Sequence, residues 1–287
     1  MLGNADMSHA GVLSVPKRAL VRSAKTALRR GYGGKPVPLS TLLRLRRFGG
    51  RENMLSFRST SVVRPGTALT NPFLAARLAD RRFGDWTISA QAMNLLEGEI
   101  RARPPKRILE FGSGLSTACF ARYMSENVPG APRPAVVSIE ENADFCSESR
   151  ALVAELRLEE LVSVHHAPLV HAEIAGRNVN VYDLPPQVLA EVESEPPDLV
   201  FIDGPGKAGG RTARWAVLHA VLPLLPNGFR FYLDDALLDW ALESGRLWDE
   251  LPGVHIAGVA LVGHGVLVGE FAAPTATRTL RPAEGRR

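Results

Sequence analysis

The stretch that most constrains the fold of this chain runs from Ile108 to Thr117. Its first part, Ile108–Phe111, is a short apolar run, long enough for one buried strand. The run ends in Gly112-Ser113-Gly114, and Leu115–Arg122 then has the pattern of a helix start. A strand that turns on glycines into a helix brings backbone N–H groups and a helix N-terminus close to a ligand. The stretch therefore predicts a ligand site at this turn.

The charge beside this turn favours a cationic ligand over a pyrophosphate. A dinucleotide fingerprint reads G-x-G-x-x-G, and Thr117 occupies the position of its third glycine. Glu110 lies just before the glycines, where a carboxylate in a partly desolvated cleft would repel a pyrophosphate. The same carboxylate suits the amino acid end and the sulfonium of S-adenosylmethionine.

The pattern Glu110-x-Gly112-x-Gly114 resembles the first motif of the class I S-adenosylmethionine-dependent methyltransferases. The resemblance implies S-adenosyl-L-methionine as the cofactor and places its binding at this turn. The residues that it implies for cofactor binding here are Glu110, Gly112, Ser113, Gly114, Ser116 and Thr117.

A second acidic position follows the next predicted strand. The β-branched run Ala135–Ile139 is closed by Glu140, Glu141 and Asn142, before a predicted helix over Ala143–Leu156. An acid that ends the second strand of such a unit can accept hydrogen bonds from both hydroxyls of a ribose. Glu140 is the candidate for that role. The alternative is that one of these three residues caps the following helix, and adjacent acids allow both interpretations.

The third predicted strand, Leu161–His165, ends in histidines. Enzymes of the resembling family often carry an acid after this strand to hold the adenine amine. This chain departs from that pattern, so the resemblance leaves His166 or backbone groups for the adenine contact. His165, His166 and His171 fit no common zinc spacing, and we expect them to have structural or surface roles.

Two further predicted strands end in aspartates. Leu199–Ile202 is apolar throughout, as expected of a strand buried on both faces of a parallel sheet, and Asp203 follows it. Phe229–Leu233 likewise ends in Asp234 and Asp235. The carboxyl ends of such strands are where open α/β sheets bind ligands. Three carboxylates that converge there repel one another unless they are protonated or bridged by a cation, and oxygen ligands favour Mg²⁺ over zinc.

The resemblance gives these aspartates a more specific role. In the catechol O-methyltransferase-like and cephalosporin hydroxylase-like groups, acids at these two places hold a divalent metal that binds the substrate hydroxyl. By that resemblance Asp203, Asp234 and Asp235 are candidate Mg²⁺ ligands, although the catechol type has Asp-Asn where this chain has Asp-Asp. Asp203 is also a candidate cofactor-binding residue. Without a metal, Asp203 could act as the general base for a hydroxyl, and Asp235 could cap the next helix.

Predicted strands and helices alternate along the second half of the chain and end in a hairpin. Val254–Val262 and Gly265–Phe271 have the pattern of two strands joined by a glycine turn. The alternation predicts a doubly wound parallel sheet, and a closing antiparallel strand is what the class I methyltransferase fold adds. We therefore expect an α/β fold: a Rossmann-like, mostly parallel, seven-stranded sheet with a C-terminal antiparallel hairpin. The expected domain spans 61–271, between a basic extension over 1–60 and a disordered tail over 272–287.

Positive charge is concentrated in the N-terminal extension. Residues 1–60 hold 12 lysines and arginines against two acids, whereas the whole chain carries a net charge of only +4. The extension, with a possible amphipathic helix over 12–30, is interpreted as a solvated basic segment, a membrane-surface or anionic-partner contact, or a cleaved transit-like segment. A charge confined to an extension is weak evidence for a nucleic-acid enzyme. The Asp203-Gly-Pro sequence also lacks the Asn/Asp-Pro-Pro-aromatic signature of nucleic-acid N-methyltransferases.

The remaining sequence features narrow the class of protein. No apolar run approaches the roughly 20 residues of a membrane span, and the two cysteines form no disulfide or metal pattern, so a cytoplasmic location is expected. The sulfonium is already activated, so no Ser–His–Asp or Cys–His set is needed. We therefore predict an S-adenosylmethionine-dependent methyltransferase that acts on oxygen of a small-molecule or sugar-like metabolite. The alternatives are an aminopropyltransferase of the spermidine synthase type and a non-catalytic cofactor-binding or interaction protein.

Overall fold

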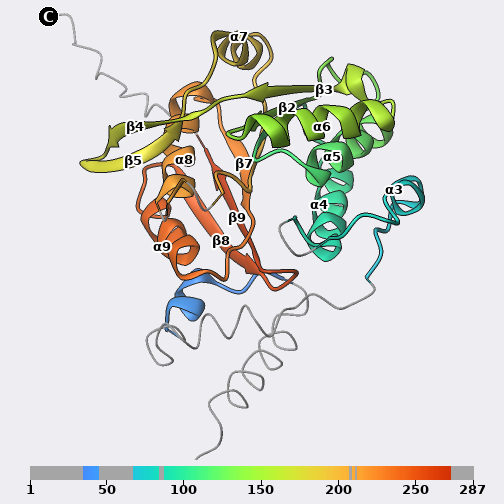
Figure 1. Cartoon of the computed structure of the whole chain (residues 1–287). Coiled ribbons are helices and arrows are strands. Elements are labelled where there is room, and N and C mark those ends of the chain that lie inside the picture. Colours follow the sequence, from blue (N-terminus) through green and yellow to red (C-terminus); the bar gives the residue numbers. More distant parts are fainter. Residues whose placement is uncertain (1–34, 45–66, 84–86, 207–208, 211, 273–287) are drawn as a thin grey trace, which may run out of the picture.

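Seven strands form one sheet in the order β3-β2-β1-β6-β7-β9-β8 (Figure 1). The computed structural model describes residues 35–44, 67–83, 87–206, 209–210 and 212–272. Neighbouring strands from β3 to β7 run parallel, and β9 pairs antiparallel with both β7 and β8. The strands are β1 (Ile108–Phe111), β2 (Val136–Glu140), β3 (Val162–His166), β6 (Leu199–Ile202), β7 (Phe229–Leu233), β8 (Val254–Ala260) and β9 (Val266–Phe271). The predicted mostly parallel sheet with its C-terminal antiparallel hairpin is confirmed.

Helices cover both faces of this sheet and create two apolar cores. Side chains alternate along β1: Ile108 belongs to one core, and Leu109 and Phe111 belong to the other. On the face of Ile108 lie α3 (Pro72–Arg77), α4 (Ala90–Ala102), α5 (Leu115–Asn127) and α6 (Ala143–Glu155). On the face of Phe111 lie α7 (Pro186–Ser194), α8 (Ala213–Leu224) and α9 (Asp239–Trp248).

The helix after β2 starts at a side-chain cap. The Asn142 carboxamide oxygen accepts hydrogen bonds from the backbone N–H groups of Asp144 and Phe145. Asn142 is therefore the N-cap of α6, among the three candidates that the sequence offered. Glu140 and Glu141 are left for other partners.

A hairpin inserted between β3 and β6 projects beside α8 (Figure 1). Its strands are β4 (Leu169–Ile174) and β5 (Arg177–Tyr182), which pair only with each other. The connecting residues Ala175 and Gly176 both have positive φ, as a tight hairpin turn requires. The alternating sequence over 178–182 is typical of a short strand, whereas the sequence of its partner β4 gives a weaker signal.

A short piece of the basic extension packs on the edge of the sheet. Val37 forms an antiparallel bridge with Val259 of β8, and a helix over 39–44 buries Leu39 and Leu42 in the core. This segment covers the β8 edge, which would otherwise present unpaired backbone groups. The predicted helix over 12–30 and the tail lie outside the described residues, and the domain boundary at residue 60 stays a prediction.

No helix in the described part of the chain is both long enough and apolar enough to cross a membrane.

Candidate functional site

The turns after β1 and β6 touch each other through their backbones. Gly112 has a φ of +91°, and a Cβ built on it would lie 2.6 Å from the backbone N of Gly204. The backbone N–H groups of Asp203 and Gly204 both donate to the Phe111 carbonyl, at 2.8 and 2.7 Å. Glycine is therefore required at position 112, for both its conformation and the close approach of the two turns.

Glu110 lies fully buried under the glycine turn and is held by hydroxyl groups. Its Oε2 accepts hydrogen bonds from Thr117 Oγ1 at 2.6 Å and from Ser138 Oγ at 2.7 Å. Thr117 Oγ1 also accepts from the backbone N–H of Gly114, at the N-terminus of α5. Thr117, at the position of the third glycine of a dinucleotide fingerprint, thus connects the buried carboxylate to the turn through its hydroxyl. Ser116 is also buried here, and its side chain helps to lower the pKa of Glu110.

The Glu110 carboxyl has little to compensate for its burial. Desolvation raises the pKa of Glu110 to about 7, although its hydroxyl partners oppose the shift. Its second oxygen, Oε1, has no hydrogen-bond partner among the described residues. A buried carboxylate without a basic partner is stabilised when a cationic group binds nearby. The arrangement therefore fits a positively charged ligand.

Glu140 ends β2 and faces the same turn. Its Oε2 accepts from the backbone N–H of Ser113 at 2.8 Å and from the Ser113 hydroxyl at 3.2 Å. Its Oε1 accepts from the backbone N–H of Asn142 at 3.0 Å. Burial, with a smaller contribution from the neighbouring Glu141, raises the pKa of Glu140 to about 7. The carboxylate is thus fixed beside the glycine turn, with both oxygens engaged by residues that border the site.

Glu141 connects three segments at the carboxyl ends of the strands, a role that the sequence analysis did not predict. Its Oε2 accepts a hydrogen bond from the Tyr182 hydroxyl at 3.0 Å, and its Oε1 accepts from the backbone N–H of Gly206 at 2.6 Å. The end of β2, the β4–β5 hairpin and the loop after β6 are thereby connected. His166 lies exposed at the end of β3, with its Nε2 3.2 Å from the Glu141 carbonyl oxygen. His165 points elsewhere, with its Nε2 3.2 Å from Glu191.

The predicted aspartates meet at the ends of β6 and β7, but an arginine lies between two of them. Arg214, in the first turn of α8, places Nη2 3.2 Å from Asp203 Oδ1 and Nη1 3.6 Å from Asp235 Oδ2. Asp235 Oδ1 lies 3.3 Å from His264 Nδ1. Asp234 is buried, and its Oδ1 has no hydrogen-bond partner among the described residues.

Burial and repulsion between neighbouring carboxylates raise the pKa of both Asp203 and Asp234. Desolvation raises the pKa of Asp203 to about 6, while the Arg214 guanidinium opposes the shift. The pKa of Asp234 is raised well above its usual range by burial and by the carboxylates of Asp203 and Asp235. Asp203 can therefore accept a proton from a hydroxyl near neutral pH.

The aspartates do not fit a divalent metal as they stand. The described residues contain no group of three or more His, Cys, Asp and Glu side chains arranged to hold a metal ion. The oxygen atoms of Asp203 and Asp235 that would face a shared ion face the Arg214 guanidinium instead. The metal set remains a prediction from the resemblance. The predicted cap is absent too, because α9 begins at Asp239, with Leu238 rather than Asp235 at its N-cap.

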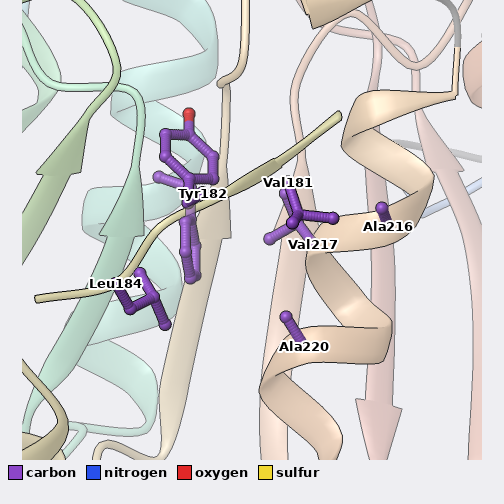
Figure 2. A pocket seen from close by; sticks show the side chains of 7 residues that line it. Val181, Tyr182, Leu184, Ala216, Val217 and Ala220 are labelled. Carbon is purple, nitrogen blue, oxygen red and sulfur yellow. The ribbon is translucent and has the colours of Figure 1, made fainter. Parts of the chain in front are cut away.

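A small apolar pocket lies beyond this site, under the β4–β5 hairpin (Figure 2). Val181 points toward α8, whereas the Tyr182 hydroxyl points away from the pocket toward the rim. The lining residues are Phe111, Val181, Tyr182, Leu184, Ala216, Val217 and Ala220. The pocket is a packing gap between hairpin and helix, not a site for a charged nucleoside.

Comparison with known proteins agrees with this geometry. Residues 109–236 match the family described as a methyltransferase domain. No curated protein sequence matches the chain. Cofactor-bound Rv0187 from MTB is 21% identical, with a TM-score of 0.51 over 71% of this chain and 91% of that chain. The O-methyltransferase TomG from Streptomyces achromogenes, solved in complex with SAM, is 18% identical, with a TM-score of 0.50 over 78% of this chain and 99% of that chain. Both likenesses show the fold.

Proposed function

We propose that this S-adenosylmethionine-dependent methyltransferase transfers a methyl group to an oxygen atom of a small, hydroxyl-bearing substrate, with Asp203 as the general base. The observation that carries the proposal is the position of the Asp203 carboxyl. It is largely buried, it follows the strand next to β1, and its backbone touches the glycine turn. A proton acceptor is thus held beside the expected cofactor site.

The cofactor would be held by the residues around the turn after β1. Glu110 would attract the positive charge of the ligand, and the turn Gly112–Gly114 would let the ligand approach the backbone and the N-terminus of α5. Glu140 would accept hydrogen bonds from the ribose hydroxyls, since its carboxylate is held at the border of the same turn. His166, exposed at the end of β3, is our candidate for the adenine edge.

Methyl transfer requires the protein mainly to align the substrate oxygen with the methyl group and to provide a proton acceptor. When bound, S-adenosylmethionine supplies a methyl group that its sulfonium already activates, so an attacking oxygen needs only to be in line and to lose its proton. Asp203 would take that proton on its carboxylate. The loop after β6, tied to Glu141 through Gly206, would hold the substrate oxygen near Asp203.

The rival readings of the sequence are less well supported. The family match favours methyl transfer over aminopropyl transfer and over a domain without activity. Metal assistance, which the resemblance implies, finds no fitting set of ligands among the described residues. The cytoplasmic location and a surface or partner contact through the basic extension remain predictions.

The test compares Asp203→Asn with a matched exposed variant, Asp183→Asn. Turnover would be followed as S-adenosylhomocysteine release with phenols, sugars and amines as acceptors. We expect that only the acceptors with a hydroxyl group are methylated. Asp203→Asn should lower kcat by about 10²–10⁴-fold. Binding of S-adenosylhomocysteine, measured by calorimetry, should be unchanged in both variants. Methylation of amines alone, or full activity of Asp203→Asn, would refute the proposal.

A further inference from the structure

We propose that Arg214 is a cation built into the chain, and that it takes the place of the divalent metal at the acidic edge of the sheet. Methyl transfer by this enzyme would then need no metal. The inference deepens the proposed function, and of its two tests only the measurement of methyl transfer rests on that function. Its evidence is the environment of the Arg214 guanidinium.

The guanidinium is fixed from several directions. Nε donates to the Pro205 carbonyl at 3.2 Å, and Nη1 donates to the Asp234 carbonyl at 3.4 Å. These two acceptors lie in the loops that follow β6 and β7. The residue is 8% exposed, and its guanidinium carbon lies 5.2 Å from the centre of the Trp240 ring. Arg214 is thus a buried and oriented cation, not a surface residue that happens to reach an acid.

The same guanidinium spans the two strands whose acids were expected to share an ion. Nη2 faces Asp203 at the end of β6, and Nη1 faces Asp235 at the end of β7. Asp235 has a left-handed φ of +58°, a conformation that aspartate adopts more readily than most residues other than glycine. Carboxylates from neighbouring strand ends are therefore brought together around a positive charge that belongs to the protein.

A second cation would be unfavourable in this place. One carboxylate oxygen of Asp203 and one of Asp235, which a bridging divalent ion would share, already face N–H groups of Arg214. A divalent ion among them would lie within a few ångströms of the guanidinium, where like charges repel strongly in a partly buried site. The Arg214 guanidinium is therefore a permanent positive charge at this edge of the sheet, and it occupies the place of the divalent ion.

This arrangement gives Arg214 a positioning role. It orients the Asp203 carboxyl, and it keeps positive charge near the oxygen that loses its proton, as a fixed cation does at sites of developing negative charge. Loss of Arg214 should therefore lower kcat much more than it raises KM. A role in folding alone would not produce that split.

The decisive measurement is binding of Mn²⁺, followed by electron paramagnetic resonance, to the full chain without substrate. We expect no stoichiometric site in the wild-type protein and one new site in Arg214→Ala, at least tenfold tighter than any wild-type binding. Arg177→Ala is the matched control, because Arg177 also stacks on a tryptophan, Trp215, but lies on the hairpin. It should create no site. Arg214→Gln, which keeps side-chain donors, repeats the test, and retained S-adenosylhomocysteine binding shows that each variant is folded.

The activity arm uses chelation and rescue. Wild-type turnover should be unchanged in excess EDTA, whereas Arg214→Ala should lose about 100-fold in kcat and recover in part with Mg²⁺ or free guanidinium. One Mn²⁺ bound by the wild-type chain at Asp203, or folded Arg214 variants that bind none, would overturn the inference. If no acceptor is ever methylated, the proposed function fails, while the Mn²⁺ result still decides the role of Arg214.

Discussion

The candidate site has two halves, one at the ends of β1 and β2 and one at the ends of β6 and β7. They compensate for the charge of buried carboxylates in different ways. At the ends of β1 and β2, the only donors to Glu110 and Glu140 within the described part of the chain are hydroxyl and backbone N–H groups. At the ends of β6 and β7, Asp203 and Asp235 share the guanidinium of Arg214. The first half keeps an uncompensated negative charge, which suits a cationic cofactor. The second half has a cation of its own, which offsets part of its negative charge and suits a neutral hydroxyl substrate.

Gly112→Ala would break the contact between the two halves, and it should have the largest effect. The added Cβ would meet the Gly204 backbone at 2.6 Å, at a φ of +91°. Strain and overpacking together should lower the free energy of unfolding by about 3–5 kcal/mol. Gly98→Ala in α4, where a Cβ meets nothing within 4 Å, should instead stabilise by about 0.5–1 kcal/mol. Urea unfolding of both variants measures the contrast, and equal effects would contradict it.

Glu110→Gln would sharpen the difference in compensation. Burial raises the pKa of Glu110 to about 7 in the folded chain from an ordinary value of 4.5. A raised acid pKa contributes stability that is present below pH 4.5 and lost as the pH rises to 7. The wild-type chain should lose about 3 kcal/mol from this group over that window, whereas the glutamine variant should not.

Urea titrations between acidic and weakly basic pH measure that prediction. Glu148→Gln, at an exposed position of α6, is the control and should leave the pH dependence as in the wild type. A curve for Glu110→Gln that runs parallel to the wild type would show that the buried carboxyl is compensated after all.

Glu140→Gln tests the half of the site at the ends of β1 and β2 through its affinity for S-adenosylhomocysteine. The amide keeps the size of the side chain but can accept only on one oxygen, so one hydrogen bond to a ribose hydroxyl should be lost. We expect the Kd for S-adenosylhomocysteine to rise about tenfold, roughly 1.4 kcal/mol. Isothermal titration calorimetry measures the change. An unaltered Kd would remove Glu140 from the proposed ribose contact.

Tyr182→Phe should have the smallest effect, because it removes one hydrogen bond at the rim between the halves. The hydroxyl donates to Glu141 Oε2 at 3.0 Å, and Glu141 keeps its bond from the Gly206 N–H. The loss should be about 1 kcal/mol in the free energy of unfolding. Thermal unfolding measures it, and a loss of several kcal/mol would mean that the hairpin depends on this one contact.

The parallel sheet was predictable from the sequence, whereas the inserted hairpin was only half predictable. Strands β6 and β7 are buried on both faces, β6 is apolar throughout and β7 is rich in aromatic residues, so their ends could be placed closely. Strand β4 is short and has no fully buried residue, so its alternation of apolar residues with His171 and Glu173 is only a weak strand signal. It becomes a strand only because β5 lies beside it, and pairing of that kind leaves little signal in one segment.

The candidate site divides in the same way. Glu110, Glu140 and the three aspartates could be found because each lies at the end of a recognisable strand. Arg214 could not be assigned a partner, because the loop after β6 and the rotation of α8 decide where its side chain points. The sequence did contain a signal: an arginine opens the helix after Asp203, close to an excess of acids. No spacing rule connects that arginine to the end of another strand.

The shared carbonyl of Phe111 makes the two turns one mechanical unit. Asp203 and Gly204 both depend on it, and Gly112 leaves no slack between the chains. In the proposed function, a displacement of the turn after β1 by the bound cofactor would therefore also displace the peptide of Asp203, the proposed base. Arrival of the methyl donor and alignment of the proton acceptor would then be a single displacement, transmitted through main chain alone.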